Sequence, residues 1–301
     1  MLNTIGILSP GDMGHSVGNV LREHGLRVIA YLGDRSERTR ALAREAQIEE
    51  VPSYRALVQE ADAVLSILVP AQAMAAAELV AGALRETGAD VLYADCNAIA
   101  PQTAQAVGDV ITQAGGCFVD ASIIGGPPRN DYAPRIYASG PAAAEFAALA
   151  DYGLDIRVID DVIGHASALK MCYASLTKGS AALYAELMIA AKALGVEETL
   201  IAEFKQSQAD RFAGIERSLP RVPVKARRFV GEMEEMAKMY DALGLTPNML
   251  AGAAKVYDLI GSTPLADRTP EDTLPFPTLD KALAIFVEHL RESRISESAN
   301  G

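Results

Sequence analysis

The sequence predicts an α/β domain with a parallel sheet, followed by an all-α domain. Up to about residue 160, short apolar runs alternate with helical patterns, which is typical of a parallel sheet with helices on both faces. From residue 164 onward, the apolar positions recur only at helical spacing. We therefore expect a first domain over residues 1–162, a helical domain over 163–293 and a disordered tail over 294–301.

Apolar runs and periodic segments locate the individual elements. Seven apolar runs predict strands at residues 4–8, 27–32, 63–68, 91–94, 117–121, 136–138 and 156–159. Five periodic segments predict helices at residues 165–194, 197–216, 224–243, 247–260 and 278–291. Apolar faces on helices tend to be buried between subunits, so the apolar helical half also predicts a homodimer. A self-contained bundle is the alternative.

The composition favours a globular chain with a small-molecule ligand. The net charge of −12 over 301 residues argues against a nucleic-acid or anionic-membrane surface. The longest apolar stretch, residues 61–84, is interrupted by Asp62, Pro70 and Glu78 and predicts no membrane span. Three cysteines without paired spacing fit a reducing compartment and no metal site. Since no basic segment precedes the first strand, we expect no signal peptide and a cytoplasmic location.

A glycine-spaced turn joins the first expected strand to the first helix. Strand, glycine turn and helix N-terminus together predict a site for a dinucleotide diphosphate. Gly11 would let the backbone approach the phosphates, and Gly14 would let helix and strand pack closely. Ser9 occupies the first glycine position of the G-x-G-x-x-G fingerprint, so an ordinary strand-to-helix turn is the alternative. The expected cofactor-binding residues are Ser9, Pro10, Gly11, Asp12, Met13 and Gly14.

The end of the second strand bears on the choice between NADP and NAD. NAD specificity normally requires a carboxylate there, and that position falls at Leu32. Arg35 and Ser36 follow and can hydrogen-bond a 2′-phosphate, so NADP is favoured. NAD stays open, because a small loop shift would bring Asp34 to the ribose. The structural alternative for these charges is a solvated helix start.

Two further segments follow strands at the edge where α/β sheets bind ligands. Val69 and Pro70 come after the third expected strand and are assigned to the cofactor site. Asn97 follows the next strand, and its amide could bind the nicotinamide carboxamide or a substrate oxygen. An Asx turn before a helix explains Asn97 equally well.

A glycine pair and a lysine complete the set of candidate residues. Gly125 and Gly126 follow a strand and expose N–H groups that can bind a carboxylate, with Ser122 just before them. Lys170 is the charged residue of an otherwise apolar run at the start of a long helix. The helix dipole and partial burial both favour its neutral amine, as acid–base chemistry requires. A lysine whose charge reaches solvent from a helix surface is the alternative.

These motifs, taken in order, resemble those of the β-hydroxyacid dehydrogenase superfamily, the relatives of 6-phosphogluconate dehydrogenase and 3-hydroxyisobutyrate dehydrogenase. Residues 9–14 are similar to the family's G-x-G-x-M-G turn and residues 95–101 to its D-x-S-T-x-x-P element. Residues 120–126 resemble its D-A-P-V-S-G-G loop and residues 164–174 its G-x-G-x-x-x-K-x-x-N-N helix. The resemblance covers nearly the whole chain. It implies a Rossmann-type domain, a helical domain like that of 6-phosphogluconate dehydrogenase, and Lys170 as the catalytic lysine.

The departures from the family pattern bear on the substrate. Ile124 replaces the serine of the substrate loop, which leaves Ser122 as the hydroxyl there. Tyr173 and Ala174 replace the two asparagines of the lysine helix, so Tyr173, Thr177 or Lys178 would orient the substrate. The second half resembles a less characterised bacterial branch.

The resemblance implies an NAD(P)-dependent oxidoreductase that acts on a small hydroxyacid-type alcohol or its carbonyl partner. Lys170 would be the general acid in reduction and the base in oxidation. The substrate is expected to bear a carboxylate. Imine reduction is one alternative, and it predicts substantial activity without Lys170. A dinucleotide-binding protein without turnover is the other.

Overall fold

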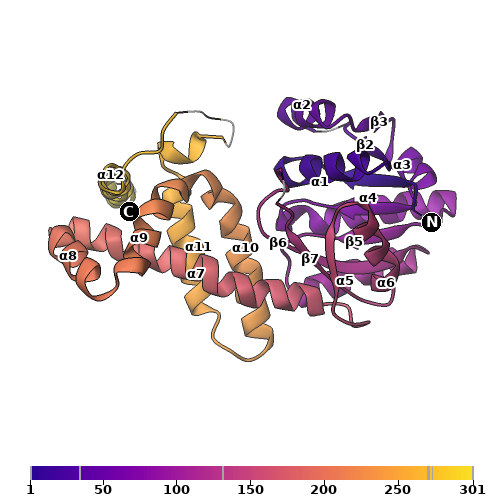
Figure 1. Ribbon diagram of the computed structural model, residues 1–301. Helices are drawn as coiled ribbons and strands as arrows, with labels where there is room; N and C mark the ends of the chain where they lie inside the picture. The colour runs from indigo at the N-terminus through magenta and orange to yellow at the C-terminus, as the bar shows by residue number, and fades with distance from the viewer. Residues whose placement is uncertain (1, 34, 131, 270–271, 273, 300–301) are drawn as a thin grey trace. The chain divides into compact units, whose positions relative to one another are not determined.

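The computed structural model describes residues 2–33, 35–130, 132–269, 272 and 274–299. The chain forms two compact units, residues 1–172 and 173–301 (Figure 1). The expected boundary was 162/163, ten residues earlier. The difference arises because the long helix α7, His165–Ala193, begins within the first unit and continues into the second.

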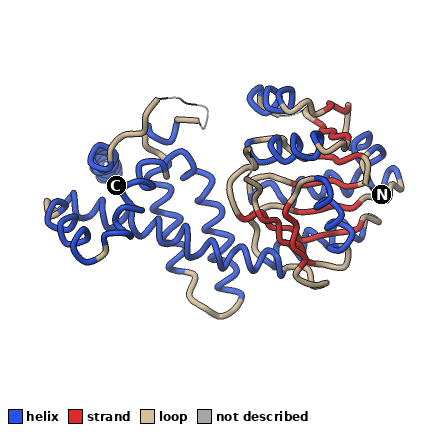
Figure 2. The backbone as a smooth tube through the Cα atoms, viewed as in Figure 1, coloured by secondary structure: helices blue, strands red, loops and turns tan. Residues whose placement is uncertain are grey.

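The first unit is built on an eight-stranded sheet, coloured red in Figure 2, in the order β3-β2-β1-β4-β5-β6-β7-β8. Strands β1 to β6 are parallel, β7 is antiparallel to β6, and β8 is parallel to β7. The strands are β1 Thr4–Leu8, β2 Arg27–Tyr31, β3 Glu49–Val51, β4 Ala63–Ser66, β5 Leu92–Asp95, β6 Cys117–Ile124, β7 Arg135–Ser139 and β8 Asp155–Val158. The predicted α/β class is confirmed. The prediction missed β3, which is short and has two exposed glutamates in place of an apolar run.

Helices cover both faces of this sheet because the strands are apolar on both sides. Val17 and Leu21 of α1 and Phe146 of α6 pack on one face. Leu57 of α3 and Leu84 of α4 pack on the other, beside α5. The helices are α1 Asp12–Glu23, α2 Glu37–Glu45, α3 Tyr54–Glu60, α4 Ala73–Thr87, α5 Pro101–Gln113 and α6 Ala143–Phe146, with the 3-10 helices η1 Pro70–Gln72 and η2 Ala147–Tyr152.

Among the described residues of the second unit, all regular secondary structure is helical, as predicted. Its core includes Met233 and Met236 of α10 and Tyr257 of α11, all buried. Besides the later turns of α7, it contains α8 Glu197–Ser207, α9 Ala209–Ser218, η3 Leu219–Arg221, α10 Pro223–Ala242, α11 Asn248–Gly261, η4 Pro264–Asp267 and α12 Leu279–Ala299. None of the helices in the described part of the chain is both long and apolar enough to cross a bilayer.

Two helix boundaries differ from the expectation. The helix predicted over residues 197–216 is divided into α8 and α9, because Gln208 between them has φ −144° and ψ 45°, outside the helical region. The expected disordered tail over 294–301 is helical through Ala299. No proline or glycine interrupts the chain between the predicted end at Arg291 and Gly301. Residues 300 and 301 lie outside the described residues.

Candidate active site

The turn after β1 has the backbone geometry of a dinucleotide fingerprint despite its serine. Ser9 has φ +66°, the left-handed conformation that glycine supplies at the first fingerprint position. The Gly11 N–H donates to the Ser9 carbonyl at 2.7 Å, which closes the turn. A Cβ on Gly14 would lie 2.7 Å from that same carbonyl oxygen. Glycine is therefore required at position 14 for the turn to pack against the helix.

The start of α1 is open to an anion. Gly11 is its N-cap residue and provides no side-chain cap, whereas Ser36 caps α2 and Ser53 caps α3. A Cβ on Gly11 would meet no atom within 4 Å, so the space beside Gly11 is open. The first N–H groups of a helix and its dipole favour negative charge. The residues of this turn fit a dinucleotide diphosphate.

The predicted 2′-phosphate residues lie at the start of α2. The Ser36 hydroxyl accepts a hydrogen bond at 3.3 Å from the N–H of the third residue of α2, so it serves as the helix cap. Arg35 is half-buried. Arg38 forms an ion pair with Asp12, which joins the start of α2 to the start of α1. The pair also offsets the negative charge of Asp12 in the turn of residues 9–14, the expected diphosphate turn. Asp34, on which the NAD alternative depends, lies outside the described residues.

Replacing Gly14 by Ala is expected to disrupt both the turn and dinucleotide binding. The added methyl group would collide with backbone rather than with a side chain that can rotate away, at a cost of about 1–3 kcal/mol. Gly11→Ala is the matched control, because its methyl group enters open space and should leave the free energy of unfolding nearly unchanged. It should still weaken NADPH binding by blocking the phosphates. Urea unfolding and fluorescence titration separate the two effects, and equal stability of both variants would contradict this account.

A row of buried polar side chains crosses the sheet at the ends of β4 and β5. Ser66 pairs in register with Asp95, Asp95 with Asp120, and Asp120 with Ser139. All four are buried. Because side chains alternate along strands, Asp95 and Asp120 share the sheet face of Tyr93, which α3, α4 and α5 cover. The register thus brings two carboxylates side by side at one edge of the sheet.

Asp120 anchors the beginning of α7. Its Oδ2 accepts the N–H groups of Gly164 and Ser167, each at 3.0 Å, and its Oδ1 accepts the Ser167 hydroxyl at 2.7 Å. The Ser139 hydroxyl donates to the same carboxylate at 3.3 Å and accepts the Ala166 N–H at 3.0 Å. Burial raises the pKa of Asp120, and these hydrogen bonds oppose that rise. The carboxylate therefore acts as an N-terminal cap supplied by the sheet.

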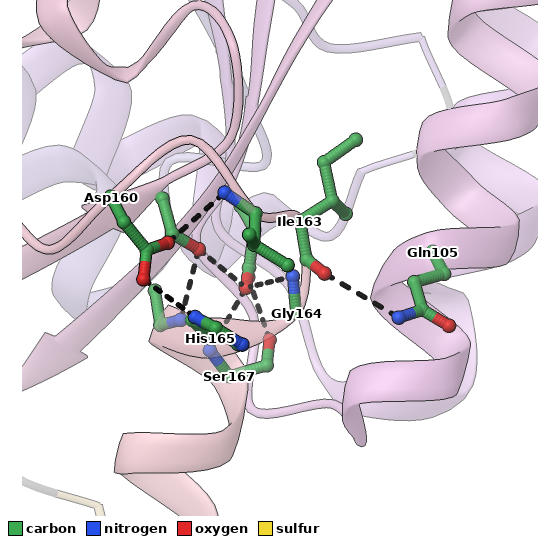
Figure 3. Close-up of polar contacts among 10 residues, drawn as sticks. Gln105, Asp160, Ile163, Gly164, His165 and Ser167 are labelled. Carbon is green, nitrogen blue, oxygen red and sulfur yellow. Dashed lines mark hydrogen bonds and ion pairs between the residues drawn. The ribbon is translucent and has the colours of Figure 1, made fainter.

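Three further contacts fix the segment that leads into α7 (Figure 3). The Asp160 carboxylate contacts His165 Nδ1 at 2.6 Å and accepts the Val162 N–H at 3.0 Å. The Gln105 amide on α5 donates to the Ile163 carbonyl at 3.4 Å. The start of the helix is therefore tied to β6, β7, α5 and its own preceding loop.

Lys170 reaches the carboxyl edge of the sheet from the second turn of α7. It is half-buried, and its Nζ donates to the main-chain carbonyl of Asn97 at 3.4 Å. The side-chain Nδ2 of Asn97 donates to Ser66 Oγ and Asp95 Oδ2, both at 2.9 Å, while its Oδ1 accepts the Leu68 N–H. The Asn97 amide is held in an internal network, and Asp95 forms an Asx turn with the Asn97 N–H, while the expected role of Asn97 in cofactor binding stays a prediction. The Asn97 carbonyl faces the lysine.

The loop after β6 also differs in part from the expectation. The Gly126 N–H donates to the Tyr132 hydroxyl at 3.3 Å, so that group already has a protein partner. Gly125 has φ +135°, and a Cβ there would lie 2.2 Å from the same hydroxyl. Ser122 is fully buried, and its Oγ has no hydrogen-bond partner among the described residues. A buried hydroxyl without a partner is costly, which makes Ser122 the better candidate here for a bound ligand.

The remaining predicted residues are divided between the two units. Val69, 41% exposed, and Pro70, which begins η1, follow β4 at its carboxyl end as expected. Tyr173 is 51% exposed and belongs to the second unit, as does Thr177, whose hydroxyl donates to the Tyr173 carbonyl at 3.3 Å. Sequence reasoning gave no role to Ser66, Asp95, Ser139 or Ser167, and it placed Asp120 only in the expected substrate loop. The available signal was an aspartate at or near the end of two expected strands, Asp95 after residues 91–94 and Asp120 in residues 117–121.

A mostly parallel sheet with an open glycine turn after β1 and a lysine at the same edge defines a dinucleotide-binding domain of the dehydrogenase type. Residues 4–151 match the family described as the NAD binding domain of 6-phosphogluconate dehydrogenase, and residues 191–260 match a domain of unknown function, DUF1932. The structure of MTH1747, a conserved protein of unknown function with structural similarity to 3-hydroxyacid dehydrogenases, is 32% identical, with 85% of this chain and 96% of that chain covered and a TM-score of 0.63.

Two enzymes share the fold at lower identity. Mycobacterium tuberculosis 3-hydroxyisobutyrate dehydrogenase, solved with L-serine, is 18% identical over 97% of this chain and 100% of its own, with a TM-score of 0.68. The imine reductase from Myxococcus stipitatus, solved with NADP+, is 18% identical over 95% and 99%, with a TM-score of 0.55. The chain belongs to the β-hydroxyacid dehydrogenase superfamily, as its motifs suggested.

Proposed function

We propose that the protein is an NAD(P)-dependent oxidoreductase that acts on a small hydroxyacid-type alcohol or its carbonyl partner. The observation that carries the proposal is the position of Lys170. Its Nζ lies 3.4 Å from the Asn97 carbonyl, at the same sheet edge as the diphosphate turn. The helix that bears it is anchored by Asp120. A dehydrogenase needs a proton-transfer group at that edge.

The chemistry divides between cofactor and protein. Residues 9–14 would hold the dinucleotide, which would supply hydride transfer to or from the substrate carbon. The amine of Lys170 takes the hydroxyl proton as the C–O bond becomes C=O, and its ammonium gives that proton back in the reverse direction. Ser122, Gly125 and Gly126 would orient a substrate carboxylate, with Ser122 Oγ as the hydroxyl donor.

NADP is the proposed cofactor, with NAD as the alternative. Arg35, in the loop between β2 and α2, is the residue suited to a 2′-phosphate. Arg35→Ala is expected to weaken NADPH binding about tenfold or more and to change NADH binding little, since NADH lacks that phosphate. Fluorescence titration of purified protein measures both constants. Arg85→Ala, an exposed arginine on α4, is the matched control. Equal losses for both cofactors would argue against a 2′-phosphate contact.

Imine reduction is the second candidate reaction. It is supported by the absence of the asparagine pair after Lys170 and by the fold shared with an imine reductase. The two candidates make different predictions for a variant without the lysine. A binding protein without turnover is a third possibility, and it predicts cofactor binding without any substrate-dependent change in NADPH absorbance.

We also propose that the protein is a homodimer through its helical unit. A mainly apolar stripe follows α7 at alternating spacings of three and four, the pattern of helices that pack against a partner helix. Leu176 in this stripe is 72% exposed and Leu183 is 58% exposed. The α7 stripe consists of Tyr173, Leu176, Ser180, Leu183, Leu187 and Ala190, with the small serine as its exception to the apolar pattern.

Replacing Leu183 by Glu is expected to raise the dimer dissociation constant at least about 100-fold, because a charge would be buried in the α7 stripe. Analytical ultracentrifugation over a range of protein concentrations gives this constant. The matched control is Leu79→Glu on α4, where the leucine is 53% exposed outside the stripe. A monomeric wild-type protein, or a dimer insensitive to Leu183→Glu, would overturn this interface.

A further inference from the structure

The carboxylate of Asp95 has no part in the chemistry described so far, although it lies at the end of β5 beside the lysine network. We propose that Asp95 is a positioning residue that acts through Asn97 and stabilises the ammonium form of Lys170. The inference rests on the proposed function in that Lys170 is taken as the acid–base group. It adds a residue that sets the protonation state of that group.

The geometry consists of a short chain of hydrogen bonds. Asp95 Oδ1 accepts the Asn97 N–H at 2.9 Å, and Oδ2 accepts the Asn97 side-chain amide at 2.9 Å. The carbonyl of Asn97 in turn accepts from Lys170 Nζ at 3.4 Å. The Asp95 carboxylate thus holds both the main-chain N–H and the side-chain amide of Asn97, the residue whose carbonyl accepts from Lys170. Asn97 is buried, so this arrangement is shielded from bulk water.

The charged and titratable groups around Asp95 are few. Tyr93 and Cys96 flank it on the same segment, both buried with a raised pKa, so neither supplies a negative charge near neutral pH. Asp120 on the neighbouring strand is already surrounded by donors from α7. Lys170 is a cation whose charge lowers the pKa of Asp95. The pair of interest is therefore Asp95 and Lys170.

Electrostatics support the direction of the effect. Burial raises the pKa of Asp95 to about 7, Asp120 adds to that rise, and Asn97 and Lys170 oppose it. Since the influence of two charges is mutual, a carboxylate stabilised by Lys170 stabilises the Lys170 ammonium in return. Above about pH 7, Asp95 is mainly ionised, and this support is present. An enzyme working in the reduction direction needs that ammonium as its proton donor.

The test measures the pH at which Lys170 becomes reactive. Purified wild type and Asp95→Asn are trace-labelled with acetic anhydride from about pH 6 to about pH 11, and the peptide containing Lys170 is quantified by mass spectrometry. In the variant, the reactivity midpoint of Lys170 is expected to fall by about one pH unit. Lys255, exposed in the second unit, is the internal control and should not shift. An unchanged midpoint in a folded variant overturns the proposal.

A second measurement covers the case in which Asp95→Asn does not fold, since the amide can replace only one of the two acceptors. In Lys170→Met, the carboxyl group of Asp95 should keep its proton to a higher pH than in wild type. Infrared spectroscopy follows the carbonyl stretch of a buried carboxylic acid, and an identical titration in both proteins would overturn the proposal. Neither measurement needs a substrate. If no hydroxyacid or carbonyl is turned over, the proposed function fails while these results still decide the role of Asp95.

Discussion

Replacing Lys170 by Met is expected to lower kcat for a hydroxyacid or its carbonyl partner by about 10²-fold or more. The loss follows because a methionine keeps most of the packing volume of the lysine but cannot transfer a proton. NADPH affinity should stay within about twofold of wild type, since the lysine lies outside the diphosphate turn and the start of α2. Steady-state kinetics together with fluorescence titration separate the two quantities.

The matched control is Lys255→Met, which removes the same charge from an exposed position on α11. Its kcat should equal that of wild type. If Lys170→Met retains most of its activity, the acid–base assignment is wrong and imine reduction becomes the better interpretation. If neither wild type nor variant changes NADPH absorbance with any hydroxyacid, carbonyl or imine, the binding-protein alternative gains support.

Replacing Asp120 by Ala is expected to lower the free energy of unfolding by about 3–5 kcal/mol and to reduce activity through the misplaced lysine. The substitution leaves the N–H groups of Gly164 and Ser167 and the Ser167 hydroxyl without their acceptor in a buried place. Each such loss costs about 1–3 kcal/mol, and removal of the buried charge offsets part of the sum. Urea unfolding of the two proteins measures the difference.

Ser167→Ala is the graded control, because it removes the hydroxyl bond and keeps the N–H bonds to Asp120. It should cost about 1 kcal/mol. A loss for Asp120→Ala that is no larger than that of Ser167→Ala would contradict an anchoring role for the carboxylate.

The raised pKa of Asp120 determines the direction in which its contribution to stability changes with pH. Burial raises the pKa of Asp120 in the folded protein above its ordinary value of 3.8. The folded state therefore binds the proton more tightly than the unfolded state, and stability is lost as the pH rises from about 4 through the raised pKa. Asp120→Asn should lack this part of the slope. An identical slope in both proteins would show that other groups dominate.

The features predicted well from the sequence are those that local chemistry determines. Runs of apolar residues identified seven of the eight strands because parallel strands are buried on both faces. The glycine turn after β1 was visible because Gly14 has no alternative at its backbone contact. The left-handed Ser9 was not visible, since a serine can adopt many conformations and only the closed turn selects this one.

The polar row could not be predicted because it depends on strand register. Ser66, Asp95, Asp120 and Ser139 lie far apart in sequence, and a shift of one residue in any pair would separate them. The role of Asn97 was undecided for a related reason. Its amide has two donors and one acceptor, and only the positions of its neighbours show that all three are already used.

The reversal of strand direction at β7 determines which end of a helix meets the ligand edge. A crossover helix runs back against the strand before it, so helices that follow β1, β4 and β5 begin at the carboxyl edge and lead away from it. The strand before α7 points the other way. The first turn of α7 consequently starts beside Asp120, within β6, and its second turn reaches Asn97 beyond the end of β5. A helix that follows one of the parallel strands β1, β4 or β5 turns its first N–H groups toward the carboxyl edge. A helix that follows the reversed strand brings a later residue, and so a side chain, to that edge. Within one sheet, the reversal at β7 thus distinguishes α1, which begins at the carboxyl edge, from α7, which runs toward that edge and brings Lys170 to it.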